Sequence, residues 1–192
     1  RYAESLLWFL GHDPRVPEVM RNEMNRCGWA DDEFTDNGNF PYQLYVRECR
    51  RIVGKYVMTQ QDVQGARSEA AASAIGLGSY ALDCHFVNYL ATTDGVRIEG
   101  GMFVGTKPYP VPYGAILPKE DECSNLLVPV CMSASHVAYS SLRMEPVYMV
   151  LGQSAAIAAV LSLRERCIPQ EIPYEKLRES LLENGQILEY GK

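Results

Sequence analysis

The sequence has 192 residues, of which 47% are hydrophobic and 22% charged, a composition typical of a globular domain with a sizeable core. Its formal charge of −6 and its pI near 5.1 argue against a nucleic-acid-binding surface. The six cysteines are dispersed without a C-x-x-C pair, which favours free thiols over a disulfide framework. No basic region followed by an apolar stretch opens the chain, so no secretory signal is expected within it, and the compartment stays open.

Two helices are predicted near the N-terminus. Residues 2–10 are largely apolar and are followed by Gly11, and residues 17–26 place Pro17 at a helix start with apolar positions on one side. The polar, turn-rich residues 29–40 follow.

A third helix is predicted over residues 41–52. On such a helix Arg47 and Arg51 lie four positions apart with Arg50 on the adjoining face, so their guanidinium groups would converge. Converging arginines bind carboxylates or phosphates. The alternative is a solvated face on which they pair with Glu48 and nearby acids.

The middle of the chain is predicted to contain short strands, a helix and a hairpin. A strand is predicted over residues 53–58, a helix over 62–74, a strand over 80–90, and a hairpin region over 92–107 with its turn at Thr93-Asp94-Gly95.

Within the predicted strand over 80–90, Asp83 and His85 would share one face. Two such ligands are too few for a metal site. A metal-dependent hydrolase would therefore need a third ligand, and no metal site is predicted.

The C-terminal part is organised around an apolar stretch. An extended connector over 108–118 precedes a predicted buried strand over 126–130 and a small-residue loop over 133–141. A helix then begins at Pro146, and an amphipathic helix over 173–182 places Tyr174, Leu177, Leu181 and Leu182 inward.

The helix that begins at Pro146 is predicted to be buried all round. Among residues 147–161 only Gly152, Gln153 and Ser154 are not clearly apolar. The charge-free run just reaches transmembrane length, but its polar residues and its proline favour a buried helix over a membrane partner. Its N-terminus offers free N–H groups and partial positive charge to a ligand.

These elements predict an α+β fold. It has N-terminal helices, a mixed or antiparallel sheet between Val53 and Val130, and a long buried C-terminal helix against that sheet.

Several motifs together resemble one family, from about Trp29 to the end of the chain. They are residues 32–38 (DEFTDNG), 43–51 (QLYVRECRR), 76–80 (GLGSY), 125–131 (NLLVPVC), 133–136 (SASH), 143–146 (RMEP) and 152–155 (GQSA). The chain resembles the C-terminal part of the FAD-dependent oxidoreductases often called xanthan-lyase-like.

The resemblance implies that three parts of the chain have different roles. Residues 1–107 would form part of a substrate or cap domain, residues 108–165 a flavin-side segment, and residues 166–192 a peripheral helix. The helix after Arg-Met-Glu-Pro would point its N-terminus at the pyrimidine edge of FAD. The implied cofactor-binding residues are Ser135, Arg143, Met144, Glu145, Pro146, Val147, Gly152 and Gln153.

The implied substrate is a small molecule or carbohydrate. The residues expected to act on it are Arg50, Arg51, His85 and His136. His136, in the small-residue loop, is the best candidate for a base or hydrogen-bond donor, although a structural role is the ordinary alternative. Ser133 and Ser135 lack the G-x-S-x-G pattern of a serine hydrolase.

No G-x-G-x-x-G opens a βαβ unit, since Gly76-Leu77-Gly78 lacks the third glycine. The half that grips the ADP part of FAD is therefore expected to be missing from this fragment of a two-domain fold. The fragment alone would bind flavin weakly, be inactive, and either expose apolar surface or form a homo-oligomer.

Two further expectations concern Gly114 and an alternative function. The chain has Tyr113-Gly114 where relatives more often have Tyr-Arg, so an arginine contact is lost or moved. The alternative function is a non-catalytic binding domain, which would hold an anionic or carbohydrate ligand with the Arg47–Arg51 face and the tyrosines Tyr109 and Tyr113.

Overall fold

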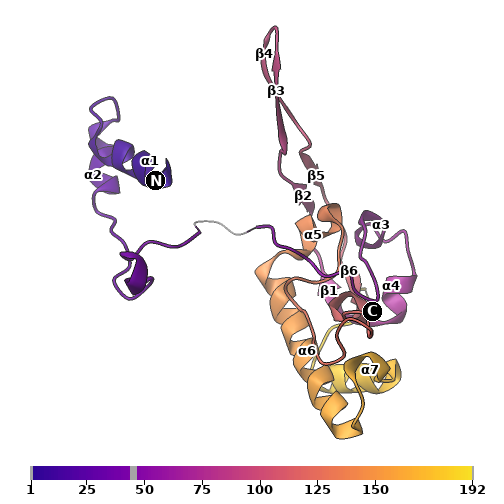
Figure 1. The fold of residues 1–192 in the computed structure, drawn as a ribbon. Coiled ribbons are helices and arrows are strands. Elements are labelled where there is room, and N and C mark those ends of the chain that lie inside the picture. Colours follow the sequence, from indigo (N-terminus) through magenta and orange to yellow (C-terminus); the bar gives the residue numbers. More distant parts are fainter. Residues whose placement is uncertain (1, 44–46, 192) are drawn as a thin grey trace. The chain divides into compact units, whose positions relative to one another are not determined.

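The computed structural model describes residues 2–43 and 47–191, and the chain divides into two compact units, Arg1–Val46 (unit 1) and Arg47–Lys192 (unit 2). Figure 1 labels their helices and strands. The predicted α+β class is confirmed. In the described residues the strands form three separate two-stranded antiparallel sheets rather than one sheet.

Unit 1 contains both helices predicted near the N-terminus. They are α1 (Tyr2–His12), which continues through Gly11, and α2 (Glu18–Met24), and a 3-10 turn η1 (Thr35–Asn37) follows. The Asn25 side-chain amide donates to the Gly11 carbonyl at 2.8 Å, which ties the two helices together. Of the described residues in this unit only Gly11 and Val16 are buried, so unit 1 has almost no core of its own.

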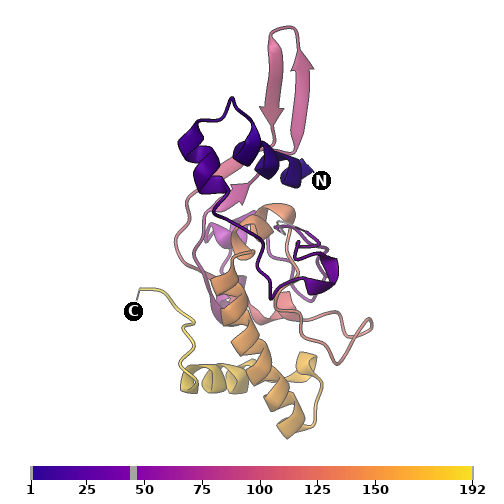
Figure 2. The ribbon, with the colours of Figure 1, turned by 90° about the vertical axis from the view of Figure 1, so that its left-hand side faces the viewer.

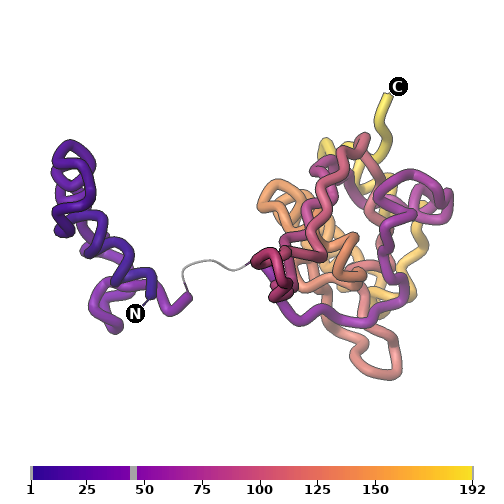
Figure 3. The backbone as a smooth tube through the Cα atoms, turned by 90° about the horizontal axis from the view of Figure 1, so that it is seen from above, coloured from indigo at the N-terminus to yellow at the C-terminus, as the bar shows by residue number. Residues whose placement is uncertain are grey.

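The helix predicted over 41–52 is wrong wherever it can be checked. Residues 44–46 lie outside the described part, and residues 47–52 form an irregular, non-helical segment that Figure 3 shows as a tube without helical turns. The strand predicted over 53–58 is also absent, apart from one parallel bridge between Met58 and Ala134.

A physical reason lies in the hydrogen bonds of this segment. Its N–H groups donate to carbonyls far along the chain instead of to local ones. The bonds are Ile52 to Cys131 (3.1 Å), Lys55 to Leu117 (3.0 Å), Tyr56 to Gly114 (3.1 Å) and Met58 to Ser133 (3.0 Å). Tertiary partners have replaced the local helix ladder.

Two short helices, α3 (Gln60–Val63) and α4 (Glu69–Ala72), stand where one helix over 62–74 is predicted. The chain then enters β1 (Ala74–Gly78), which pairs antiparallel with β6 (Tyr109–Pro112). This pair carries much of the core. Tyr109 and Tyr113, predicted as stacking side chains of a connector, are both buried, and Tyr113 begins a 3-10 turn, η2 (Tyr113–Ile116).

The strand predicted over 80–90 is two strands in different sheets. β2 (Leu82–Cys84) pairs with β5 (Met102–Val104), and β3 (Asn88–Thr92) pairs with β4 (Gly95–Glu99) across the predicted turn, which is confirmed. Figures 1 and 2 both show the β3–β4 hairpin extending away from the rest of unit 2, and every residue of β3 is exposed.

The C-terminal part is helical. Residues 126–130 are not a strand, and the loop predicted over 133–141 is largely a helix, α5 (His136–Leu142). α6 (Glu145–Glu165) is the long predicted helix with proline in its first turn, and η3 (Pro169–Glu171) and α7 (Tyr174–Glu183) follow. α7 buries Leu177 and Leu181 as predicted, whereas Leu182 is exposed.

α6 is buried on one side only, which corrects the prediction that it is buried all round. Its buried face carries Val147, Leu151 and Ala158. The helix packs against β1 and α7 (Figure 1). The opposite side exposes Met149 by 73% and Leu163 by 80%. By length and composition alone α6 could cross a membrane, but its contacts with β1 and α7 make it the core helix of unit 2.

A buried polar network fixes α6 to β1 and to the C-terminal segment. Ser154 Oγ donates to the Ile75 carbonyl at 2.6 Å. The Gln186 amide contacts the Ile75 carbonyl (3.2 Å), the Val150 carbonyl (2.9 Å) and Ser154 Oγ (2.5 Å). Because each buried polar group has a partner, the network holds these three segments in one arrangement.

Candidate functional site

The predicted site residues that the fold brings together meet at Glu48. One carboxylate oxygen, Oε1, lies 3.3 Å from His136 Nδ1 and 3.5 Å from Arg143 Nη1. The other, Oε2, accepts from Arg51 Nη1 at 2.8 Å. We call these four residues the Glu48 cluster. Sequence reasoning singled out His136, Arg51 and Arg143 but treated Glu48 only as a partner for arginines.

α5 and the turn after it position two members of this cluster. Ser135 is the N-cap of α5, and its Oγ accepts from the Ala138 N–H at 3.2 Å. His136, the first residue of α5, is half exposed, and no partner of its Nε2 atom is found among the described residues. The cap therefore holds the backbone of His136 in place while one ring nitrogen faces solvent.

Arg143, which ends α5, is a buried cross-link. Its side chain is 4% exposed, and it donates to the Arg47 carbonyl at 3.0 Å and to the Asp83 carbonyl at 2.7 Å. Its Nε atom is buried without a hydrogen-bond partner in the described part of the chain. Arg143 thus joins the 47–52 segment to β2 rather than presenting its charge to solvent.

Arg51 is held from two sides. Its Nε donates to the Ala134 carbonyl at 3.0 Å, and its guanidinium lies 4.8 Å from the centre of the Tyr139 ring. The predicted convergence of Arg47 with Arg51 depended on a helix that is absent. Instead Arg51 and Arg143, whose side chains are 19% and 4% exposed, both contact Glu48.

Tyr139 lies behind the cluster as a hydrogen-bonding centre. Its hydroxyl contacts Tyr148 Oη at 2.7 Å and Cys49 Sγ at 2.9 Å, and it donates to the Val130 carbonyl at 3.2 Å. Burial, followed by the hydrogen bonds with Cys49 and Tyr148, raises the pKa of Tyr139 well above its ordinary value. Tyr139 therefore stays protonated and serves as a fixed donor and acceptor.

The other two residues expected to act on substrate lie outside this cluster. Arg50 is exposed, with no ion pair among the described residues. His85 is exposed, and its Nε2 lies 3.7 Å from Asp83 Oδ2, so the predicted Asp83–His85 neighbourhood is confirmed. Within residues 2–43 and 47–191 no three potential metal ligands gather.

Of the implied cofactor-binding residues, Ser135 and Arg143 flank α5, and the others lie from Met144 to Gln153, at the start and along the first half of α6. Glu145 and Pro146 are exposed at its start, Met144 is half-buried and Val147 is buried. The Val147 and Tyr148 N–H groups, expected as free donors, both donate to the Met144 carbonyl, at 2.9 and 3.1 Å.

Further along α6 the chain leaves room beside the helix. A Cβ added at Gly152 would meet nothing within 4 Å. The exposed Gln153 side chain donates to the Asn184 carbonyl at 3.0 Å. The space beside Gly152 is therefore open.

The structure also explains Gly114, where an arginine is more usual in the resembled family. A Cβ at Gly114 would lie 2.9 Å from the Tyr56 Cβ and 3.3 Å from the Tyr56 nitrogen. No longer side chain fits unless the Tyr56 backbone shifts.

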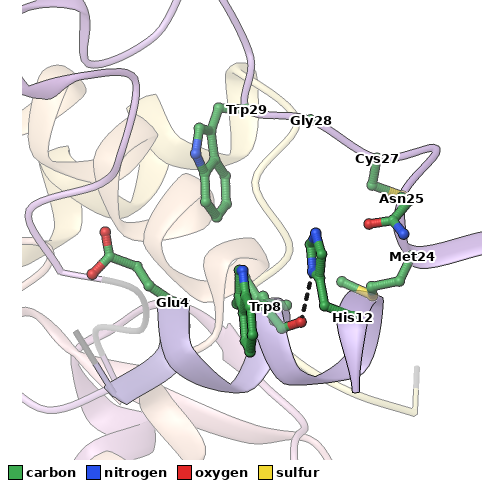
Figure 4. Close-up of a pocket in the computed structure, with 9 residues that line it drawn as sticks. Glu4, Trp8, His12, Met24, Asn25, Cys27, Gly28 and Trp29 are labelled. Carbon is green, nitrogen blue, oxygen red and sulfur yellow. Dashed lines mark hydrogen bonds between the residues drawn. The ribbon is translucent and has the colours of Figure 1, made fainter. Parts of the chain in front are cut away.

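Unit 1 has a pocket of about 430 Å³ that sequence reasoning missed. Figure 4 shows α1 presenting Glu4, Trp8 and His12, and Trp29 facing them from the segment after α2. The Trp8 and His12 rings stack with centroids 4.9 Å apart, and His12 Nδ1 lies 2.9 Å from the Trp8 carbonyl. The spacing of four between Trp8 and His12 on a helix was the available signal.

Comparison with known proteins gives one match. The family model described as FAD dependent oxidoreductase matches residues 1–181. No curated protein matches the chain, and no solved structure matches it. Since the match spans nearly all of the sequence, this chain belongs to the FAD dependent oxidoreductase family.

Proposed function

We propose that this chain is the substrate-binding and flavin-closing part of a xanthan-lyase-like FAD-dependent oxidoreductase, and that it is inactive without the half that holds the ADP part of FAD. The observation that carries the proposal is the one-sided burial of α6. A helix this apolar is normally covered all round, yet Met149, Val160 and Leu163 are exposed. The flavin-binding half would cover this face.

The residues at the start of α6 fit the ring of a flavin in two respects. Glu145 and Pro146 leave the first turn of a 21-residue helix exposed, and Gly152 leaves open space one to two turns further on. The partial positive charge of such a helix end stabilises nearby negative charge by about 0.3–1 kcal/mol. FAD, when bound, supplies the oxidation by accepting electrons from the substrate.

The Glu48 cluster supplies a group that can move a proton. Glu48 orients the His136 ring through Nδ1, and Nε2 is left to accept a proton from a small-molecule or carbohydrate substrate. Arg51 and Arg143 hold the Glu48 carboxylate in turn. Because both arginines also bond backbone carbonyls, the geometry of Glu48 is fixed by the fold.

The alternative of a non-catalytic binding domain depended on two features, exposed tyrosines and an arginine face, and the described part of the structure has neither. Tyr109 and Tyr113 are buried, so neither can stack on a carbohydrate, and the arginine face depended on an absent helix. The flavoenzyme proposal explains the exposed face of α6, which the alternative leaves unexplained.

The first test compares the purified 192-residue chain with the whole product of its gene by visible absorption. We expect bound-flavin bands in the whole product and none in the 192-residue chain. A whole product that is colourless and also fails to take up added FAD would end the proposal.

A second test places the docking face. Met149→Glu combined with Leu163→Glu should release flavin from the whole gene product. The same pair should leave the circular dichroism of the 192-residue chain unchanged, because both side chains are exposed there. Arg164→Glu, at an exposed polar position of the same helix, changes the net charge by the same amount and is the matched control. Full flavin retention by the double-glutamate variant would exclude this face.

The role of His136 is tested in the flavin-loaded product. His136→Gln should keep the flavin spectrum but slow substrate-driven bleaching by about 10²–10⁴-fold, the usual worth of a general base. His12→Gln, in unit 1 and outside the Glu48 cluster, is the control. Bleaching at the unmodified rate would assign His136 a structural role.

A further inference from the structure

Two of the six cysteines meet beside the Glu48 cluster. Cys49 Sγ lies 2.9 Å from Tyr139 Oη, and the same hydroxyl donates to the carbonyl of Val130, the residue before Cys131. The Ile52 N–H donates to the Cys131 carbonyl at 3.1 Å, which joins the two segments by their backbones. Burial, and after it the neighbouring Cys49 side chain, raise the pKa of the Cys131 thiol.

From this geometry we infer that Cys49 and Cys131 form a redox-active dithiol, which closes to a disulfide by exchange with a low-molecular-weight disulfide. Both residues are half-buried, so a small reagent can reach them while the surrounding chain keeps them together. The inference does not rest on the proposed flavin function.

The order of the two steps follows from their surroundings. The raised pKa of the Cys131 thiol, caused by burial and by the neighbouring Cys49 side chain, keeps that thiol protonated. Since the thiolate is the nucleophile, Cys49 is assigned the first attack.

The exchange balances without any further reagent. The Cys49 thiolate attacks one sulfur of the small disulfide, its S–S bond breaks, and one small thiol leaves with a proton. Cys131 loses its proton and attacks the Cys49 sulfur of the mixed disulfide, which releases the second small thiol. Two protein thiols are oxidised and one disulfide is reduced to two thiols.

Closure would act directly on the Glu48 cluster. Cys49 lies between Glu48 and Arg51 in sequence, and Cys131 begins the loop that leads to Ser135 and His136. A disulfide between Cys49 and Cys131 would replace the Cys49–Tyr139 hydrogen bond. It would link the segment that contains Cys49 covalently to the loop that begins at Cys131. The redox state would thereby set how firmly Glu48 is held against His136.

The experiment equilibrates the folded 192-residue chain with excess oxidised glutathione, alkylates the remaining thiols, and maps the digest by mass spectrometry. We expect a peptide linked through Cys49 and Cys131 that dithiothreitol removes. In Cys131→Ser the reaction should stop at a glutathione adduct on Cys49. In Cys49→Ser the linked peptide should fall to background.

Cys167→Ser is the matched control, because Cys167 is also half-buried but lies after α6, and it should leave the linked peptide unchanged. Circular dichroism checks that each variant folds, and the mapping of the unmodified chain decides the question if a serine variant does not. Separate alkylation of Cys49 and Cys131, or separate glutathione adducts on both, in the folded unmodified chain would overturn the inference.

Discussion

Unit 1 and unit 2 use their apolar side chains in different ways. Unit 2 gathers residues from β1, β6, α5, α6 and α7 into one core, in which Ile75, Leu151 and Leu177 are fully buried. Unit 1 leaves Tyr2 89% and Trp8 64% exposed, and hydrogen bonds such as Asn25 to Gly11 join its helices. The difference shows that unit 2 has the core needed for cooperative unfolding, whereas unit 1 has almost no core of its own.

The largest expected effect tests that core. Leu151→Ala should lower the free energy of unfolding of unit 2 by about 2–5 kcal/mol, because it leaves a cavity in fully packed surroundings. Leu6→Ala in unit 1, where the side chain is exposed, should change stability by less than about 0.5 kcal/mol. Urea unfolding followed by circular dichroism measures both, and equal effects would break the contrast between the units.

Alkaline pH should lower the stability of unit 2, because it deprotonates the buried phenol of Tyr109. Burial raises the pKa of Tyr109 to about 12, against an ordinary value near 10. The folded state thus keeps the Tyr109 proton longer, so the contribution of Tyr109 to stability is constant below about pH 10 and falls as pH rises toward 12, by up to about 3 kcal/mol.

Tyr109→Phe should reduce the loss of stability at alkaline pH. It also removes the hydrogen bond between the Tyr109 hydroxyl and Ser141. Urea midpoints at about pH 8 and about pH 11 give the measurement. Tyr2→Phe, in the exposed part of unit 1, is the control. Identical pH dependence in the unmodified chain and in Tyr109→Phe would contradict the assignment.

Removing the amide that joins three segments of unit 2 should have a smaller effect. Gln186→Ala should cost about 1–3 kcal/mol, since it leaves buried carbonyl and hydroxyl groups with fewer partners. Gln64→Ala, at an exposed position, serves for comparison. Hydrogen exchange at β1 should accelerate only in Gln186→Ala, and unchanged protection there would argue against the network.

The smallest effect has the opposite sign. Gly152→Ala should stabilise the 192-residue chain by about 0.5–1 kcal/mol, because alanine is the better helix former and an added Cβ meets nothing. In the whole gene product the same change should weaken flavin retention if that space is used. Thermal unfolding and flavin absorbance together separate the two roles, and destabilisation of the 192-residue chain would show that the space is not open.

Local signals predicted the elements that local interactions build. The helices α1, α2, α6 and α7 and the turn at Thr93-Asp94-Gly95 all follow from periodicity, proline positions and turn residues. The failures at residues 47–52 and 126–130 share one cause. Their hydrogen bonds are made with distant residues, as when Ile52 bonds Cys131 and Val128 bonds Ile116, and no local pattern encodes those partners.

The candidate site, too, could be predicted from the sequence only in part. His136, Arg51 and Arg143 are suggested by residue type and by resemblance, so sequence reasoning found them. The central place of Glu48 depends on bringing residues 48, 136 and 143 together, which only the fold does. Likewise, the charge-free pattern of α6 predicted burial, but it could not show that one face of the helix would be exposed.

The contact between Gln186 and Ile75 spans 111 residues of sequence. Ribosomes add roughly 5–20 residues per second, so β1 leaves the ribosome many seconds before the side chain that completes its polar network. Until then the Ile75 carbonyl and Ser154 lack a partner that the finished fold provides. Folding of unit 2 therefore cannot be completed before residue 186 has been synthesised.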